Sequence, residues 1–195
     1  EIKMSQIILG IDPGSRKTGY GVIQMVNNEP VYLGSGCIMT GSDALYKRLL
    51  IILDGVNNII EQFHPDEMAI EETFLSQNVQ ATIKLSEARA VAMVAGASAG
   101  LEVFEYTPMQ IKQAVVGYGA AQKTQVQYMV KSLLKLNGTP QADAADALAC
   151  AICHGFASKI NRILGPNNTI ATSSRGRKVS SHSRNSWRSY TPPNQ

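Results

Sequence analysis

The stretch IILGIDPGSRKTGYGVI, residues 7–23, contains two apolar runs separated by a turn, and the first run ends on a single acidic residue, Asp12. Pro13 and Gly14 follow directly, and these are the residue types that most often end a strand in a tight turn. The second run, residues 20–26, is rich in Ile and Val, as strands are. We therefore expect two strands, with the carboxylate of Asp12 at the end of the first.

The chain up to residue 164 continues with alternating strand-like and helix-like patterns of apolar residues. The expected strands are residues 6–12, 20–26, 31–39, 67–72 and 102–106, and the expected helices are residues 44–63, 76–99, 108–116, 122–136 and 140–164. A turn cluster at residues 27–30 joins the second and third strands into a hairpin, and Asp43 is placed to cap the first helix. This order predicts an α/β fold, a five-stranded mixed sheet flanked by helices.

The composition changes after Gly165-Pro166. Residues 165–195 are rich in Ser, Asn, Arg and Pro and contain five Lys or Arg residues and no acid, so the net charge of +3 originates in this segment. Such a sequence has too few apolar residues to form a core. We expect one folded domain over residues 1–164 and a basic, disordered tail over residues 165–195.

The three cysteines are too few for a disulfide framework. Cys150 and Cys153 form a C-x-x-C pair beside His154, but they lie in the apolar run ALACAIC, and the second ligand pair typical of a zinc site is missing. We interpret them as core residues. The chain has no apolar stretch of membrane-spanning length free of charges and opens with no secretory leader, so we expect a cytoplasmic protein with no membrane partner.

Acidic residues occur where two expected strands end. Asp12 closes the first strand, and Glu71 closes the fourth after the apolar pair Ala69-Ile70. If these strands are neighbours, both carboxylates leave the sheet at the same edge of the core. Glu72 points to the opposite face of the strand and is the weaker candidate.

Two further acids lie on one face of the last helix. In QADAADALA, residues 141–149, Asp143 and Asp146 are spaced i,i+3. They repel each other, and the dipole at the helix N-terminus offsets only part of that repulsion. A divalent ion such as Mg²⁺, which takes hard oxygen ligands, would relieve it.

Each acid also has an ordinary structural interpretation. Asp12 could be a turn residue, Glu71 one half of an ion pair, and Asp143 a partner of the helix dipole. Against this, all four acids stand in apolar surroundings, where an unpaired charge is costly, and their elements can converge. The pattern therefore favours a shared metal site without excluding the structural interpretations.

The motifs LGIDPG with GYGVI, AIEE, KLSEARA and QADAADALA, in this order and at these separations, resemble the RuvC family of bacterial Holliday junction resolvases, within the RNase H-like nuclease superfamily. The resemblance covers residues 6–157. It implies an RNase H-like fold and an endodeoxyribonuclease of DNA recombination and repair that cuts two opposing strands of a four-way junction symmetrically. It also implies metal ligands at four positions that all hold a carboxylate here: Asp12, Glu71, Asp143 and Asp146.

The resemblance further implies two Mg²⁺ ions per active site, with Mn²⁺ able to substitute, and a product with a 5′-phosphate and a 3′-hydroxyl. Metal ions in such sites activate a water molecule and stabilise the leaving oxygen, so no Ser or Cys nucleophile is needed.

Basic and aromatic residues also match the family pattern. Lys123 matches a residue that contacts DNA or assists catalysis, and Lys112 matches a DNA-contacting one; both could otherwise be solvated surface lysines. Phe74 matches an aromatic residue that meets bases near the junction centre, although a Phe is more often a core residue. Lys84 and Arg89 could contact DNA or pair with acids, and we favour DNA for Lys84.

The resemblance implies several partners. The helix expected at residues 76–99 is rich in small residues and matches the dimer interface of the family, so we expect a homodimer. The branch-migration proteins RuvA and RuvB are expected partners, and the basic tail could add salt-sensitive affinity for DNA.

Three other functions compete with this one. The motif at Gly10–Gly19 also resembles the first phosphate loop of actin-like sugar kinases, but those enzymes need a second lobe that this chain is too short to supply. A junction-binding protein without catalysis would have no use for four acids facing phosphates. A different RNase H-like nuclease is disfavoured by the combination of Asp12 among glycines with the paired aspartates of QADAADALA.

Overall fold

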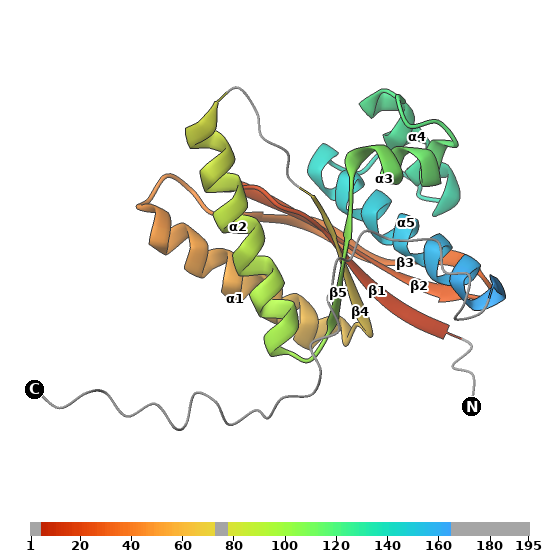
Figure 1. Ribbon diagram of the computed structural model, residues 1–195, viewed down its shortest axis with the longest axis horizontal. Helices are drawn as coiled ribbons and strands as arrows, with labels where there is room; N and C mark the ends of the chain where they lie inside the picture. The colour runs from red at the N-terminus through yellow and green to blue at the C-terminus, as the bar shows by residue number, and fades with distance from the viewer. Residues whose placement is uncertain (1–4, 73–77, 165–195) are drawn as a thin grey trace, which may run out of the picture.

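The computed structural model describes residues 5–72 and 78–164 (Figure 1). Its elements in chain order are β1 (Ser5–Asp12), β2 (Lys17–Val26), β3 (Glu29–Met39), α1 (Leu45–Phe63), β4 (Glu67–Glu71), α2 (Val79–Ser98), β5 (Glu102–Tyr106), α3 (Pro108–Val116), α4 (Lys123–Leu133) and α5 (Ala142–Leu164). All five expected strands and all five expected helices are therefore present. Phe74 and the segment 165–195 lie outside the described residues.

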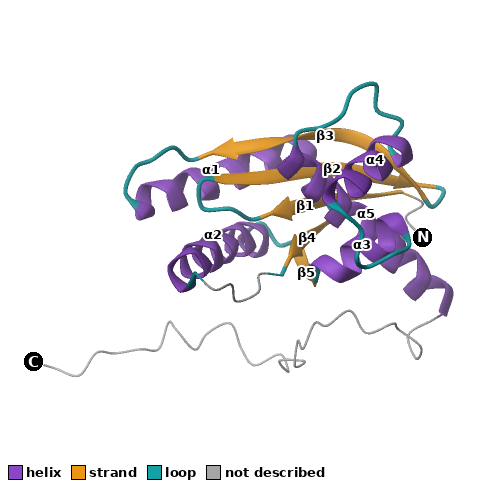
Figure 2. Cartoon of the chain, turned by 90° about the horizontal axis from the view of Figure 1, so that it is seen from above, coloured by secondary structure: helices purple, strands orange, loops and turns teal. Residues whose placement is uncertain are grey.

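The sheet is mixed, with the strand order β3-β2-β1-β4-β5, which Figure 2 shows from top to bottom. β1 pairs antiparallel with β2, and β2 with β3, whereas β4 lies parallel to both β1 and β5. Helices α1 and α2 cover one face, and α3, α4 and α5 cover the other (Figure 1). Two apolar cores thus enclose the sheet, which confirms the α/β prediction.

Local signals set most element ends. Asn27 and Asn28 both adopt positive φ angles, of 51° and 68°, as the tight turn of a hairpin requires. Thr107 and Gln110 form a reciprocal capping box at the start of α3. The prediction that Asp43 caps α1 is wrong: the cap position is Ala44, which makes no side-chain hydrogen bond, so the acid lies one residue too early in the chain.

Helix α5 packs directly on the sheet because glycines of β1 and β2 face it. A Cβ atom added at Gly10 would lie 2.1 Å from the backbone oxygen of Ala147, and one at Gly19 would lie 2.1 Å from that of Asp143. At Gly21 it would meet the backbone nitrogen of Leu148 at 2.7 Å. These glycines therefore set the distance between helix and sheet, and no larger residue fits without moving α5.

No helix among the described residues combines the length and the apolar character needed to cross a membrane.

Replacing Gly10 by Ala should destabilise the protein, because the added methyl group overlaps backbone atoms of α5 that cannot rotate away. We expect the free energy of unfolding in urea to fall by at least about 2 kcal/mol. Gly138→Ala is the matched control, because a Cβ atom there meets nothing within 4 Å, and it should change stability by less than about 0.5 kcal/mol. Equal stabilities for the two variants would refute the close contact between α5 and β1.

Candidate active site

Asp12 and Glu71 end adjacent strands and project to the same face of the sheet. In the parallel register of β1 and β4, Ile11 is the partner of Ile70, so each acid lies one residue beyond this pair. Side chains alternate along a strand. Because Ala69 belongs to the core under α5, Glu71 lies on the α5 side, as Asp12 does.

Helix α5 brings the other two acids over the ends of these strands. The backbone oxygen of Asp143 lies against Gly19, which is the register partner of Asp12. Asp146 lies one turn further and lines a cavity together with Glu71. We refer to Asp12, Glu71, Asp143 and Asp146 as the carboxylate cluster.

The charges of the cluster act on one another. Burial raises the pKa of Asp12 to about 8, and repulsion by Glu71, Asp146 and Asp143 adds to the rise. Burial also raises the pKa of Glu71 to about 7, helped by Asp146 and opposed by Lys123 and Lys112. Without an added cation, full ionisation of the cluster is therefore unfavourable.

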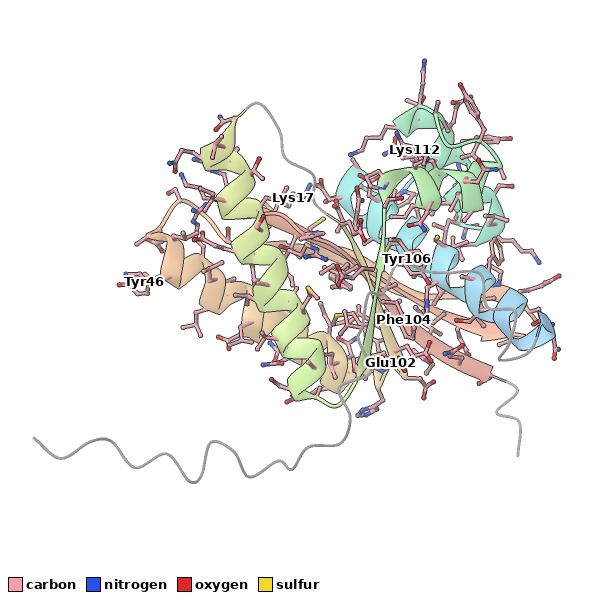
Figure 3. All side chains as sticks on the ribbon, in the orientation of Figure 1. Lys17, Tyr46, Glu102, Phe104, Tyr106 and Lys112 are labelled. Carbon is pink, nitrogen blue, oxygen red and sulfur yellow. The ribbon has the colours of Figure 1, made fainter. Side chains whose placement is uncertain are left out.

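Two lysines supply part of the missing positive charge. The Nζ atom of Lys123, at the start of α4, lies 2.6 Å from Oδ2 of Asp146. The Nζ atom of Lys17, at the start of β2, lies 2.5 Å from Oδ2 of Asp143. Figure 3 shows Lys17 at the same end of the sheet as Lys112. The two aspartates of α5 are thus paired with ammonium groups from two different elements.

Among the described residues, no group of three or more His, Cys, Asp or Glu side chains is arranged to hold a metal ion. The lysine pairs account for part of this, because Asp143 and Asp146 each direct an oxygen to an ammonium group. The donor chemistry nevertheless fits a hard divalent cation, because the cluster consists of four carboxylates, and burial together with the other three acids raises the pKa of Asp12. A cation that used the Oδ2 atoms of Asp143 and Asp146 would take the place of the two ammonium groups.

The cavity beside the cluster has a volume of about 190 Å³. Charged residues at its wall are Glu71, Asp146, Lys112 and Lys123, and its apolar wall comes from Pro108, Ile111, Val126 and Ala149. Of the lysines that the family resemblance predicts to contact DNA, Lys112 and Lys123 therefore lie beside the carboxylate cluster.

The loop that follows Asp12 is held from several sides. The Thr18 hydroxyl donates to the backbone oxygen of Gly14 at 2.8 Å. The backbone oxygen of Ser15 accepts hydrogen bonds from Thr40 Oγ1 at 2.9 Å and from Nη1 of the buried Arg48 at 3.1 Å. These bonds fix the turn after β1 and with it the position of the Asp12 carboxylate.

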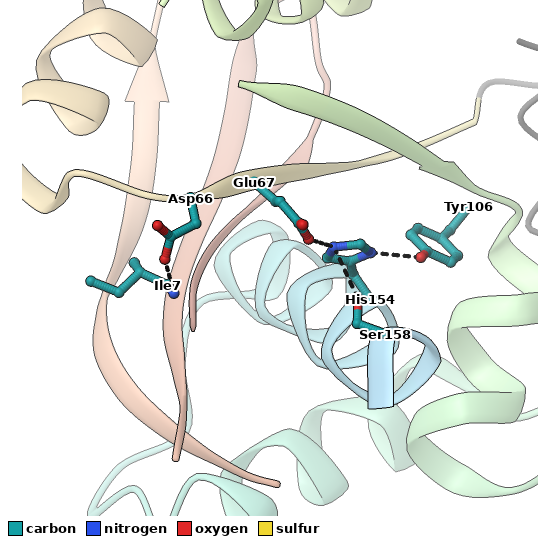
Figure 4. Close-up of polar contacts among 6 residues, drawn as sticks. All are labelled: Ile7, Asp66, Glu67, Tyr106, His154 and Ser158. Atoms are coloured by element: carbon teal, nitrogen blue, oxygen red, sulfur yellow. Dashed lines mark hydrogen bonds and ion pairs between the residues drawn. The ribbon is translucent and has the colours of Figure 1, made fainter. Parts of the chain in front are cut away.

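A buried polar network anchors the far half of α5, and the sequence analysis did not find it. His154 Nδ1 shares a hydrogen bond of 2.7 Å with the Tyr106 hydroxyl, and its Nε2 pairs with Glu67 (Figure 4). The Phe104 ring packs on the imidazole with centroids 4.3 Å apart. His154 therefore bonds to strands β4 and β5, and Cys150 and Cys153 are buried core residues as expected.

The remaining predicted residues lie elsewhere. Lys84 is exposed on α2, which covers the face of the sheet opposite to α5. Arg89 pairs with Glu105 and donates from Nε to the backbone oxygen of Glu71 at 3.2 Å, so it is an internal ion-pair residue.

Lys17 lies at the site but was not predicted, because the second strand was expected to start at residue 20, whereas β2 begins at Lys17.

Comparisons with known proteins give the family. The model of the family described as crossover junction endodeoxyribonuclease RuvC matches residues 8–154. The chain belongs to the RuvC family. The RuvC protein of Shewanella loihica is 59% identical over 148 residues, which are 76% of this chain and 86% of that protein. The RuvC protein of Shewanella sediminis is 55% identical over 171 residues, 88% of this chain and 99% of that protein.

Solved structures agree with this assignment. Thermus thermophilus RuvC superimposes with a TM-score of 0.74 at 32% identity, over 80% of this chain and 96% of that one. The same protein in complex with a Holliday junction substrate gives a TM-score of 0.75 over the same shares. The five-stranded sheet is thus the RNase H-like fold of RuvC proteins, and RuvC membership excludes the sugar-kinase alternative.

The metal-free protein should lose stability as the pH rises. The folded-state pKa of Asp12, about 8, lies above the ordinary value of 3.8, so the folded state holds its proton longer than the unfolded state. The contribution of the protonated Asp12 carboxyl group to stability is fully present below pH 4 and is lost as the pH rises through about 8. Asp12→Asn removes this loss and should raise the unfolding free energy in EDTA at pH 8 by about 1–2 kcal/mol, reduced from the full linkage value by solvent screening.

Thermal unfolding in EDTA from pH 5 to pH 8.5 measures this effect. Asp54→Asn, which changes an exposed acid on α1, serves as the control and should follow the wild type at every pH. If Asp12→Asn shows the same dependence of stability on pH as the wild type, ionisation of Asp12 is not the cause of the loss of stability.

Proposed function

We propose that this chain resolves four-way DNA junctions by metal-dependent hydrolysis of phosphodiester bonds, in DNA recombination and repair. The observation that carries the proposal is the carboxylate cluster, held between the ends of β1 and β4 and the first turns of α5, in a member of a family named for crossover junction cleavage. The Thermus thermophilus relative was solved with a Holliday junction, which supports the same substrate here.

Divalent metal dependence is general for this nuclease family. We assign Asp12, Glu71, Asp143 and Asp146 as the ligands of two Mg²⁺ ions, for which Mn²⁺ can substitute. When bound, such ions make a water molecule nucleophilic at neutral pH and stabilise the leaving 3′ oxygen. The chain contributes the fixed placement of its four carboxylates, which come from two strands and one helix.

Basic residues around the cluster hold the DNA backbone. Lys123 pairs with Asp146 from α4, and this proximity to the cluster supports a catalytic role in which its ammonium group contacts a phosphate of the DNA. Lys112 borders the same cavity and contacts an adjacent phosphate. Phe74 as a base-contacting residue and Lys84 as a DNA contact at the α2 face remain predictions from the family resemblance.

The active form is a homodimer, with one active site for each of the two cut strands. Helix α2 exposes apolar residues at helical spacing that a second copy would cover: Val79, Ile83, Ala90 and Val94. Val79 is 60% and Val94 58% exposed, which is unusual for large apolar side chains on the same helix face. RuvA and RuvB stay predicted partners, and the cytoplasm stays the predicted location.

Asp12→Asn and Asp146→Asn should abolish cleavage without abolishing binding. Each removes one ligand charge, and we expect the cleavage rate of a synthetic mobile four-way junction in Mg²⁺ to fall by about 10²-fold or more. Junction binding, measured by gel shift in Ca²⁺ or EDTA, should stay within a few-fold of the wild type. Asp54→Asn is the charge-matched control and should cut normally.

Products should be paired, symmetric nicks with ligatable ends. Equal cutting by the wild type and both variants would refute the assignment of the carboxylate cluster as the active site. Junction binding by the wild type with no cutting under any divalent ion would instead support the junction-binding alternative.

Ile83→Asp should separate the dimer, because it places a charge in the middle of the exposed apolar face of α2. Light scattering coupled to size exclusion should give the mass of one chain for this variant and of two for the wild type. Tyr128→Asp is the matched control, since Tyr128 is 70% exposed on α4, and it should remain dimeric. A wild-type protein that elutes as a monomer at all concentrations would contradict the assignment.

A further inference from the structure

We propose that Lys17 is a built-in competitor of the divalent ion for Asp143, so that it sets the metal affinity of the site. This inference rests on the proposed function, because it assigns a role toward the metal ligands of the carboxylate cluster. Lys17 was not among the residues that the family resemblance implied, and its role follows from its contacts in this structure.

The backbone of the fold places Lys17 beside Asp143. Lys17 and Gly19 are two residues apart on β2, so their side-chain positions face the same side of the sheet. Gly19 lies against the backbone oxygen of Asp143. With the strand and helix this close, the Lys17 side chain reaches the carboxylate beside it, and Nζ lies 2.5 Å from Oδ2.

The pair is exchangeable because water reaches it. The side chains of Lys17 and Asp143 are 34% and 30% exposed, and ion pairs at such positions are weak. Lysine side chains are protonated at neutral pH, so this contact joins an ammonium group to a carboxylate oxygen. A divalent ion that takes Asp143 as a ligand must displace a weakly held cation.

Lys123 does not make Lys17 redundant, because it pairs with the other aspartate of α5. Lys123 approaches Asp146 from α4 on the side of the cavity, whereas Lys17 approaches Asp143 from β2. Lys17 is absent from the residues that line this cavity. The two lysines are therefore ion-paired with different aspartates, and removal of Lys17 breaks only the ion pair of Asp143.

Metal titration of the DNA-free protein tests this role. Isothermal titration calorimetry with Mn²⁺ should show about 2- to 10-fold tighter binding for Lys17→Met than for the wild type. Lys17→Arg, which keeps the ion pair, should bind as the wild type does. Lys47→Met removes the same charge from an exposed position on α1 and should leave the affinity unchanged.

A double-mutant cycle separates direct competition from a general field effect. In the Asp143→Asn background, Lys17→Met should change the Mn²⁺ affinity by less than 2-fold, because the competed ligand is gone. The same gain in both backgrounds would overturn the proposal, as would unchanged or weaker binding by Lys17→Met itself. In each of those cases, a wild type that binds Mn²⁺ and cuts junctions leaves the proposed function standing.

Failure of the proposed function gives a different result. It would appear as a wild type that neither binds Mn²⁺ nor cuts junctions, with circular dichroism showing a folded protein. That result overturns both proposals, whereas the preceding ones overturn only the role of Lys17.

Discussion

The backbone contact of α5 with Gly10, Gly19 and Gly21 is the constraint on which the site depends. Two of the four acids lie on strands and two on the helix, so the cluster exists only if helix and sheet approach within backbone contact. An ordinary helix–sheet spacing would leave Asp143 and Asp146 several ångströms further from Asp12. The small residues at this contact therefore bring the two acids of the helix close to the two acids of the strands.

Such a cluster is costly to fold, and the rest of the domain offsets the cost. Burial first, and repulsion by the neighbouring acids second, raise the pKa values of Asp12 and Glu71, so placing charged carboxylates at this position opposes folding. The apolar core under α5 and the His154 network at its far end stabilise the same helix away from the charges. The unfavourable charges of the acids therefore lie apart from the contacts that hold α5 in place.

The sequence was enough to predict the order of strands and helices along the chain. It also predicted the strands that end at Asp12 and Glu71 and the helix that carries Asp143 and Asp146, because these features depend on local patterns. It was not enough for features that depend on distance in space. The pairing of Lys17 with Asp143 joins residues from β2 and α5, and no spacing rule connects them. The Tyr106–His154 bond is likewise long-range, and Asp43 shows that even a cap signal can miss by one residue.

The two lysine pairs also explain how the domain can fold before it meets a metal ion. Lys17 and Lys123 offset part of the charge on Asp143 and Asp146. Burial first, and repulsion by neighbouring acids second, raise the pKa of Asp12 to about 8 and that of Glu71 to about 7, so full ionisation of these two acids is unfavourable near neutrality. If these four acids hold a divalent ion, as proposed, its binding would require Asp12 and Glu71 to be deprotonated and the ion pairs of Asp143 and Asp146 to open. Because both lysines are tethered beside these aspartates, they would keep positive charge next to the cluster, where the proposed function requires a DNA phosphate to bind.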